Sequence, residues 1–186
     1  MRQITFAICA FHTIPPLNFS NLLFKLHLNY SKIYISVRDI ADKRELKEIY
    51  IMIKIIAGEK GTGKTARLVD DINTVAMEDN NVVCIERGNR LDQLLKPNVR
   101  LVNMKEYPVS GYDQLLAFVG GICSKDYDLT HIYIDSIYKV AGDDSLDNLA
   151  SFIEKLDGFL KETPITATII LSGKTDELPE GVKKFC

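Results

Sequence analysis

Short apolar runs and helical stripes alternate along residues 52–186. Four runs rich in β-branched residues predict buried strands, and a fifth stretch, in which apolar and polar residues alternate, predicts an edge strand. We expect the buried strands at 53–57, 82–86, 130–135 and 165–171, and the edge strand at 99–104. The run at 165–171 is almost unbroken in apolar character, which is typical of a central strand.

Helical periodicity fills the intervals between these strands. Apolar residues recur at helical spacing over 65–79, from about 110 to 122, and over 145–161, and the stretch 90–95 has room for a helical turn or two. Strands that alternate with helices imply right-handed crossovers and a mostly parallel sheet with helices on both faces. The pattern therefore predicts a three-layer α/β domain with a sheet of about five strands.

Polar residues mark where the helices are expected to begin and end. Ser110 and Asp113 fit a capping box at the start of the second helix. Asp143 and Asp144 are expected to cap the third helix, and Asn80 is expected to end the first.

The composition indicates a globular protein but does not indicate its function. The chain has 186 residues, of which 46% are hydrophobic and 26% charged, and a formal net charge of −2, all typical of one globular domain. That charge gives no sign of a nucleic-acid or anionic-membrane partner. The cysteines show no metal-binding spacing and are expected to be reduced thiols in the cytoplasm: Cys9, Cys84, Cys123 and Cys186.

Residues 1–51 do not share this organisation. They carry seven Lys and Arg against four Asp and Glu, and their apolar run at 4–11 is too short to span a bilayer. Lys47 and Glu48 can be encoded by AAGGAG, a bacterial ribosome-binding sequence, three codons ahead of Met52. We expect 1–51 to be a non-native or disordered extension and the domain to cover 52–186; a genuine extension with a short helix is the alternative.

One segment matches a phosphate-binding loop at every fixed position. The pattern G-x-x-x-x-G-K-[ST] is filled by Gly58, Glu59, Lys60, Gly61, Thr62, Gly63, Lys64 and Thr65. It lies between a predicted strand and a predicted helix, as this motif requires. Glycines allow backbone N–H groups to turn toward a phosphate, and the start of the helix adds further N–H groups. The sequence therefore predicts a nucleotide-binding site.

With this loop, the chain resembles the P-loop NTPases and is similar to small bacterial P-loop ATP-binding proteins. The resemblance implies that Lys64 contacts the β- and γ-phosphates of ATP and that Thr65 binds Mg²⁺. The segment His-Ile-Tyr-Ile-Asp resembles a Walker B strand, and its final residue, Asp135, is then the second magnesium ligand.

Within that family, the chain resembles the RecA-like ATPases. Many such ATPases have Glu directly after the Walker B Asp, whereas this chain has Ser136. The RecA-like pattern instead implies that Glu86, at the end of 82–86, activates the attacking water, and that Ser172 occupies a polar sensor position. Two alternatives stay open: Glu86 as a solvated strand-end charge and Ser172 as a turn residue.

Other functions remain open beside an ATPase that hydrolyses ATP slowly or on partner binding. Glu86 and Arg87 are similar to an acidic–arginine pair of nucleoside kinases, and Arg87 with Arg90 could clamp phosphates. A GTPase is disfavoured because Gly173 stands where that family's base-binding Asn is required. The third class is an interaction protein controlled by bound nucleotide.

A partner or a second copy of the chain is expected at an exposed sheet edge, because few residues follow the strand at 165–171. An arginine donated across that interface could assist hydrolysis. The sequence does not choose among the arginines of 52–186, which are Arg67, Arg87, Arg90 and Arg100.

Overall fold

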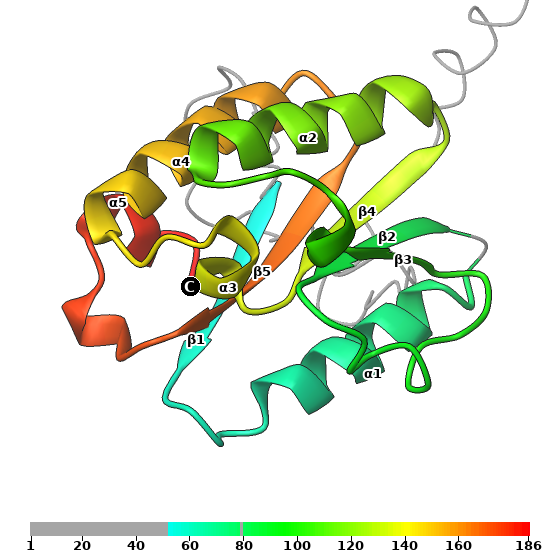
Figure 1. The fold of residues 1–186 in the computed structure, drawn as a ribbon, viewed down its shortest axis with the longest axis horizontal. Coiled ribbons are helices and arrows are strands. Elements are labelled where there is room, and N and C mark those ends of the chain that lie inside the picture. The colour runs from blue at the N-terminus through cyan, green and yellow to red at the C-terminus, as the bar shows by residue number, and fades with distance from the viewer. Residues whose placement is uncertain (1–51, 79) are drawn as a thin grey trace, which may run out of the picture. The chain divides into compact units, whose positions relative to one another are not determined.

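A computed structural model describes residues 52–78 and 80–186, so the predictions made for 1–51 lie outside the described residues (Figure 1). The strands are β1 (Ile53–Gly58), β2 (Asn81–Glu86), β3 (Arg100–Asn103), β4 (Leu129–Ile134) and β5 (Thr166–Ser172). The α-helices are α1 (Lys64–Val75), α2 (Tyr112–Lys125), α3 (Ile137–Ala141), α4 (Leu146–Leu160) and α5 (Glu180–Lys183). Two short 3-10 helices are η3 (Met104–Glu106) and η4 (Thr175–Glu177).

The five strands form one parallel sheet in the order β1-β5-β4-β2-β3. The prediction of an α/β fold with a parallel five-stranded sheet is confirmed. The predicted central strand, β5, lies between β1 and β4, and the predicted edge strand, β3, lies at one edge. Because β1 and β4 are both neighbours of β5, the residues that follow them meet at the same end of the sheet.

Helices cover both faces of this sheet, which makes three layers (Figure 1). Helices α2 and α4 pack side by side on one face, where α3 and α5 join the larger core. Helix α1 covers the opposite face and buries Leu68 and Ile72 completely against β2, β4 and β5. A hydrophobic core lies on each face of the sheet, and successive side chains of β2 point to opposite faces. Val83 and Ile85 lie in the core on the α2–α4 side, and Cys84 lies in the core on the α1 side.

Helix α1 ends at Val75, earlier than the predicted residue 79. The side-chain amide of Asn80 donates to the Val75 carbonyl at 3.0 Å, and that of Asn98 donates to the Ala76 carbonyl at 2.7 Å. These side chains satisfy carbonyls that would otherwise bond the next helical turn, so the chain can leave the helix there.

The caps of the other two long helices also differ from the prediction. Helix α2 begins after Gly111, whose φ of 82° places the start one residue beyond Ser110, and no side chain caps it. The Ser110 N–H instead donates to the Gln114 side chain at 2.8 Å. Helix α4 is capped by Ser145, and Asp143 supports that cap by accepting from the Ser145 N–H at 2.9 Å.

The stretch 90–95 forms a single hydrogen-bonded turn, since the Leu95 N–H donates to the Leu91 carbonyl at 3.1 Å. This turn agrees with the short helical stretch expected there. Leu91 is fully buried against the α1 side of the sheet, which anchors the turn to the core.

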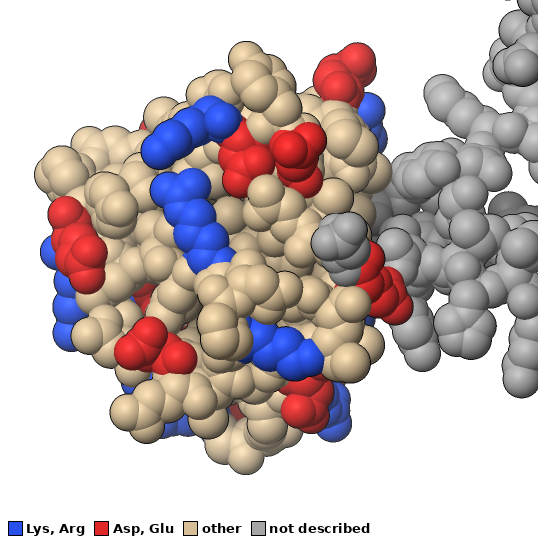
Figure 2. Space-filling model, turned by 90° about the vertical axis from the view of Figure 1, so that its right-hand side faces the viewer, with Lys and Arg blue, Asp and Glu red and all other residues tan. Residues whose placement is uncertain are grey.

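The segment after β5 covers part of one sheet edge. It buries Leu178 and Val182 and brings the Phe185 carbonyl to the Ile55 N–H of edge strand β1 at 2.7 Å. The expectation that few residues after β5 leave the edge exposed is therefore wrong at this point of β1. The opposite edge of the sheet is β3. Figure 2 shows the side of the molecule that lies to the right in Figure 1. On this side, basic and acidic side chains are interspersed with uncharged surface.

Within the described residues, no helix combines the length and the apolar character that a membrane crossing requires.

Candidate functional site

The loop between β1 and α1 has the backbone that its glycines predict. Gly61 and Gly63 have φ values of 89° and 77°, a left-handed region that L side chains rarely adopt. A Cβ atom at either position would meet nothing within 4 Å, so the loop is open there. Gly63 is the N-cap of α1 and no side chain caps the helix, which leaves N–H groups of its first turn available to an anion.

Lys64 lies under this loop and holds it together. Its side chain is 7% exposed, and its ammonium group donates to the carbonyls of Gly58 at 2.7 Å and Glu59 at 2.6 Å. The Thr62 hydroxyl donates to the same Glu59 carbonyl at 2.8 Å. A phosphate that entered the loop would therefore compete with backbone carbonyls for the Lys64 charge.

Asp135 follows β4 directly and is fully buried. Its Oδ1 accepts a hydrogen bond from the Thr65 hydroxyl at 3.4 Å, across 70 residues of sequence. The two predicted magnesium ligands are thus brought together at the start of α1. Asp135 Oδ2 accepts from the guanidinium of Arg90, which forms an ion pair with it.

The residue after Asp135 has a strained backbone. Ser136 has φ 58° and ψ 62°, and it is the one non-glycine residue with positive φ in the described part of the chain. This conformation turns the chain sharply from β4 into α3 and is concentrated at functional sites in proteins. The surrounding structure must hold this conformation in place, directly after the residue that presents the Asp135 carboxylate.

Glu86 ends β2 beside Asp135, because the preceding residues, Ile85 and Ile134, are register partners. Its side chain is fully buried, so the alternative of a solvated strand-end charge is wrong. One carboxylate oxygen, Oε1, accepts from the Leu91 N–H at 3.0 Å. The other, Oε2, is buried without a hydrogen-bond partner among the described residues. A buried carboxylate oxygen without a partner is unusual in proteins, and an internal water molecule or a catalytic role is the ordinary explanation.

Cys84 lies two residues before Glu86, on the same face of β2. Burial raises the pKa of the Cys84 thiol well above its ordinary value, and the negative charges of Glu86 and Asp135 raise it further. The thiol therefore stays protonated, and we exclude Cys84 as a nucleophile.

Two other predicted positions lie nearby with different environments. Ser172 is exposed at the end of β5, where it is the register partner of Gly58, the first residue of the loop. Arg87 is exposed, whereas the Arg90 guanidinium is paired with Asp135. The structure thus brings Ser172 to the site and gives the two arginines different environments.

Sequence reasoning did not find the pairing of Arg90 with Asp135. The available signal was the spacing of Arg87 and Arg90 after a strand end, which points to anion binding but does not say which arginine turns inward. The tertiary contacts decide this: the Gly88 N–H donates to the Asn103 side chain at 3.0 Å, and Leu91 is buried. With both ends of the turn held, Arg90 lies over the end of β4.

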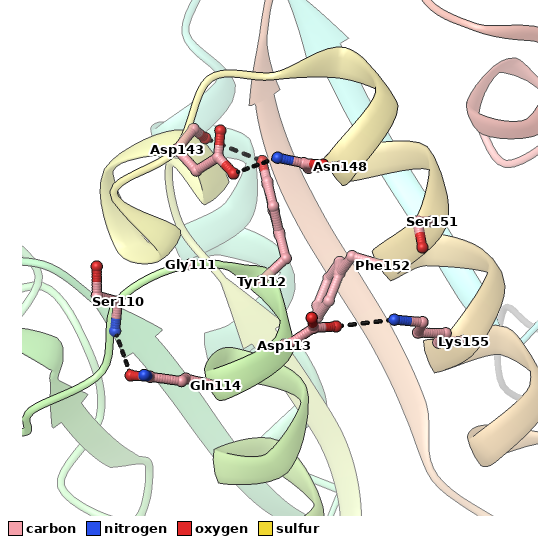
Figure 3. Close-up of a pocket in the computed structure, with 10 residues that line it drawn as sticks. All are labelled: Ser110, Gly111, Tyr112, Asp113, Gln114, Asp143, Asn148, Ser151, Phe152 and Lys155. Carbon is pink, nitrogen blue, oxygen red and sulfur yellow. Dashed lines mark hydrogen bonds and ion pairs between the residues drawn. The ribbon is translucent and has the colours of Figure 1, made fainter.

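A separate polar cavity of about 400 Å³ lies between the start of α2 and the stretch of α4 from Asn148 to Lys155 (Figure 3). Its side chains bond mainly to one another: Lys155 pairs with Asp113 at 2.8 Å, and Asn148 donates to Asp143 at 2.8 Å. The Tyr112 hydroxyl donates to the Asp143 carbonyl at 3.1 Å. None of the predicted nucleotide-site residues lines this cavity.

The residues around the loop fit a magnesium-bound nucleotide. Residues 52–78 and 80–186 contain no group of three or more His, Cys, Asp or Glu side chains able to hold a metal. Mg²⁺ does not need such a group, since it is commonly bound by one or two protein ligands together with substrate phosphates and water. Thr65 and Asp135 supply that small set beside the uncapped start of α1.

The chain matches no family model and no curated protein. The functional proposal therefore depends on the residues and geometry of this site.

Proposed function

We propose that the protein binds Mg·ATP in the loop of residues 58–65 and is a RecA-like P-loop ATPase, a nucleoside-triphosphate hydrolase that works slowly or when a partner binds. The observation that carries the proposal is the approach of Thr65 to Asp135 at the start of an uncapped helix. That arrangement places two hard oxygen groups next to free backbone N–H donors. Polyphosphates and Mg²⁺ require these two kinds of partner together.

The loop itself supplies the phosphate contacts in this proposal. The open backbone at Gly61 and Gly63 leaves space for phosphate oxygens, and the first N–H groups of α1 donate to them. Lys64 already reaches the inner side of the loop, so its ammonium needs only to exchange the Gly58 and Glu59 carbonyls for phosphate oxygens.

Thr65 and Asp135 would hold Mg²⁺, which when bound neutralises charge on the phosphate oxygens. Glu86 is the proposed general base. Its Oε2 lacks a hydrogen-bond partner among the described residues and can accept a proton from a water, while Oε1 stays bound to the Leu91 N–H.

An interaction protein controlled by bound nucleotide is the second candidate. It is favoured by the full burial of Glu86 and by the pairing of Asp135 with Arg90, since both keep the hydrolytic groups occupied or covered. A nucleoside kinase has less support, because Arg90, one of the two arginines expected to clamp phosphates, is paired with Asp135. Among the described residues, Cys84, Cys123 and Cys186 form no disulfide. The cytoplasmic location proposed from the cysteine pattern stays a proposal.

Direct binding and turnover measurements on the full chain test this proposal. Calorimetry with ATP and Mg²⁺ should give binding in the wild type and a loss of affinity of about 100-fold or more in Lys64→Ala. Lys125→Ala is the matched control, because Lys125 is an exposed lysine at the end of α2, outside the loop. Equal affinity in Lys64→Ala and the wild type would overturn the site.

The reaction class follows from the products. Phosphate released from ATP without an added acceptor indicates an ATPase, and ADP formed only with a nucleoside indicates a kinase. Tight binding without turnover indicates the nucleotide-controlled interaction protein.

A further inference from the structure

We infer that Arg90 occupies the cation position of Asp135 in the nucleotide-free protein and must leave it when Mg²⁺ enters with the nucleotide. This inference rests on the proposed function and adds a residue that sets how strongly nucleotide binding depends on Mg²⁺. The residue acts through Asp135, so it is a positioning residue.

The contacts of Asp135 carry the first step. The carboxylate is fully buried, and its two oxygens have different partners: Thr65 Oγ1 on Oδ1 and the Arg90 guanidinium on Oδ2. A buried carboxylate without a cation is costly, so the Arg90 guanidinium stabilises the buried charge of Asp135. Mg²⁺ bound near Thr65 and Asp135 would supply the same positive charge, and the repulsion between two cations next to one buried carboxylate favours the release of Arg90.

For this exchange only the side chain of Arg90 has to move, and its backbone can stay in place. The side chain of Arg90 is 55% exposed, although its guanidinium touches a buried group. The turn that carries it is held at Gly88 by Asn103 and at Leu91 by Glu86 and the core. Arg90 can therefore swing outward on its flexible stem while the backbone of the turn stays in place.

The released guanidinium would still lie close to the site. Because Arg90 is attached next to Leu91, whose N–H binds Glu86, its reach includes the edge formed by the ends of β2 and β4. Guanidinium groups bind phosphate oxygens readily. The same arginine thus balances Asp135 before the nucleotide binds and can face phosphate afterwards.

The ratio of nucleotide affinity with Mg²⁺ to that with EDTA tests this inference without an activity assay. In the wild type, Mg²⁺ must displace Arg90, so Mg²⁺ increases the nucleotide affinity less than it would at a free carboxylate. Without Mg²⁺, Arg90 offsets the repulsion between Asp135 and phosphate, so the nucleotide affinity in EDTA is higher. Arg90→Gln should therefore raise the ratio about tenfold or more, by improving binding with Mg²⁺ and weakening binding in EDTA. An unchanged or lower ratio would overturn the inference.

Control variants separate this inference from the proposed function. Arg87→Gln alters an exposed arginine three residues away and should leave the ratio within about twofold of the wild type. Arg90→Met keeps an unbranched stem without the charge; it gives the same test if Arg90→Gln fails to fold, as judged by circular dichroism. Asp135→Asn should reduce the ratio toward one, because it removes the proposed metal ligand.

The outcomes are distinguishable. If the wild type binds no nucleotide in either buffer, the proposed function fails and this inference falls with it. If the wild type and Lys125→Ala bind, Lys64→Ala does not, and the Arg90 variants keep the wild-type ratio, nucleotide binding stands and the role of Arg90 is wrong.

Discussion

Glu86 and Asp135 end neighbouring strands at the same level of the sheet and are both completely buried. One carboxylate oxygen of each residue accepts a hydrogen bond: that of Glu86 from the Leu91 N–H, and that of Asp135 from the Thr65 hydroxyl. Their second oxygens differ, since that of Asp135 faces Arg90 and that of Glu86 has no partner in the described chain. Two adjacent carboxylates are thus kept in different environments, which allows them different roles.

Replacing Glu86 by Gln should separate binding from hydrolysis. The Gln side chain can still accept the Leu91 N–H but cannot take a proton from water, so ATP affinity should be retained while turnover falls about 100-fold or more. Phosphate release under saturating ATP measures the effect, with the exposed Glu154→Gln as control. A variant that hydrolyses ATP at the wild-type rate would show that Glu86 is not the base.

Replacing Glu86 by Ala should in addition weaken the fold. The Leu91 N–H then loses its acceptor inside the protein, which costs about 1–3 kcal/mol of unfolding free energy. Urea denaturation of the two variants measures the difference. Equal stability of Glu86→Ala and Glu86→Gln would mean that the hydrogen bond to the turn contributes nothing.

Two glycine-to-alanine substitutions should change stability in opposite directions. At Gly63 the φ of 77° is unfavourable for alanine, so Gly63→Ala should lower the unfolding free energy by about 1–2 kcal/mol. At Gly121, inside α2, an added methyl group meets nothing within 4 Å and should stabilise the protein by about 0.5–1 kcal/mol. Thermal and urea unfolding measure both. Stabilisation by Gly63→Ala would contradict the left-handed loop.

Two phenylalanines of α4 provide a test of the core. Phe152 is 2% exposed and its ring lies 5.3 Å from that of Tyr112, whereas Phe159 is 38% exposed. Phe152→Ala should therefore cost about 3–5 kcal/mol of unfolding free energy. Phe159→Ala, the matched control on the same helix, should cost less than about 1 kcal/mol. Similar losses for both would contradict the packing of α4 on the sheet.

Stability should fall as the pH is lowered through the range in which His131 titrates. Burial lowers the pKa of His131 below its ordinary 6.5, and the charges of Asp71 and Glu78 offset this only in part. The unfolded chain therefore binds a proton more readily than the folded one, so unfolding free energy decreases as the pH drops below 6.5. Urea titrations between pH 7.5 and 5.5 should show this decrease, and His131→Asn should reduce it. An identical pH dependence in the variant would assign it to other groups.

Local signals predicted the sheet better than they predicted the ends of the helices. The apolar runs identified four strands, because burial between two helical layers imposes a strong pattern on each, and the alternation of apolar and polar residues identified the edge strand β3. The end of α1 depends on Asn98, which is distant in sequence, and the start of α2 depends on the backbone of Gly111. Neither the Asn98 hydrogen bond nor the backbone conformation of Gly111 can be recognised from helical periodicity alone.

The site shows the same division. Positions 58–65 form a contiguous motif, so the loop between β1 and α1 follows from the sequence. The ion pair of Arg90 with Asp135 and the burial of Glu86 depend on strand order and on the Asn103 contact that holds the turn. Such relations join segments far apart in the chain, and a single sequence contains no direct signal for them.

The bond between the Ile55 N–H and the Phe185 carbonyl has a practical consequence for handling this protein. Trimming residues 180–186 would uncover a hydrogen-bond donor on an outer strand and remove Val182 from the interior. An exposed edge strand can pair with a strand of another chain, so proteins shortened in this way should self-associate and precipitate more readily. A purification handle is consequently better attached where it does not disturb this closing segment.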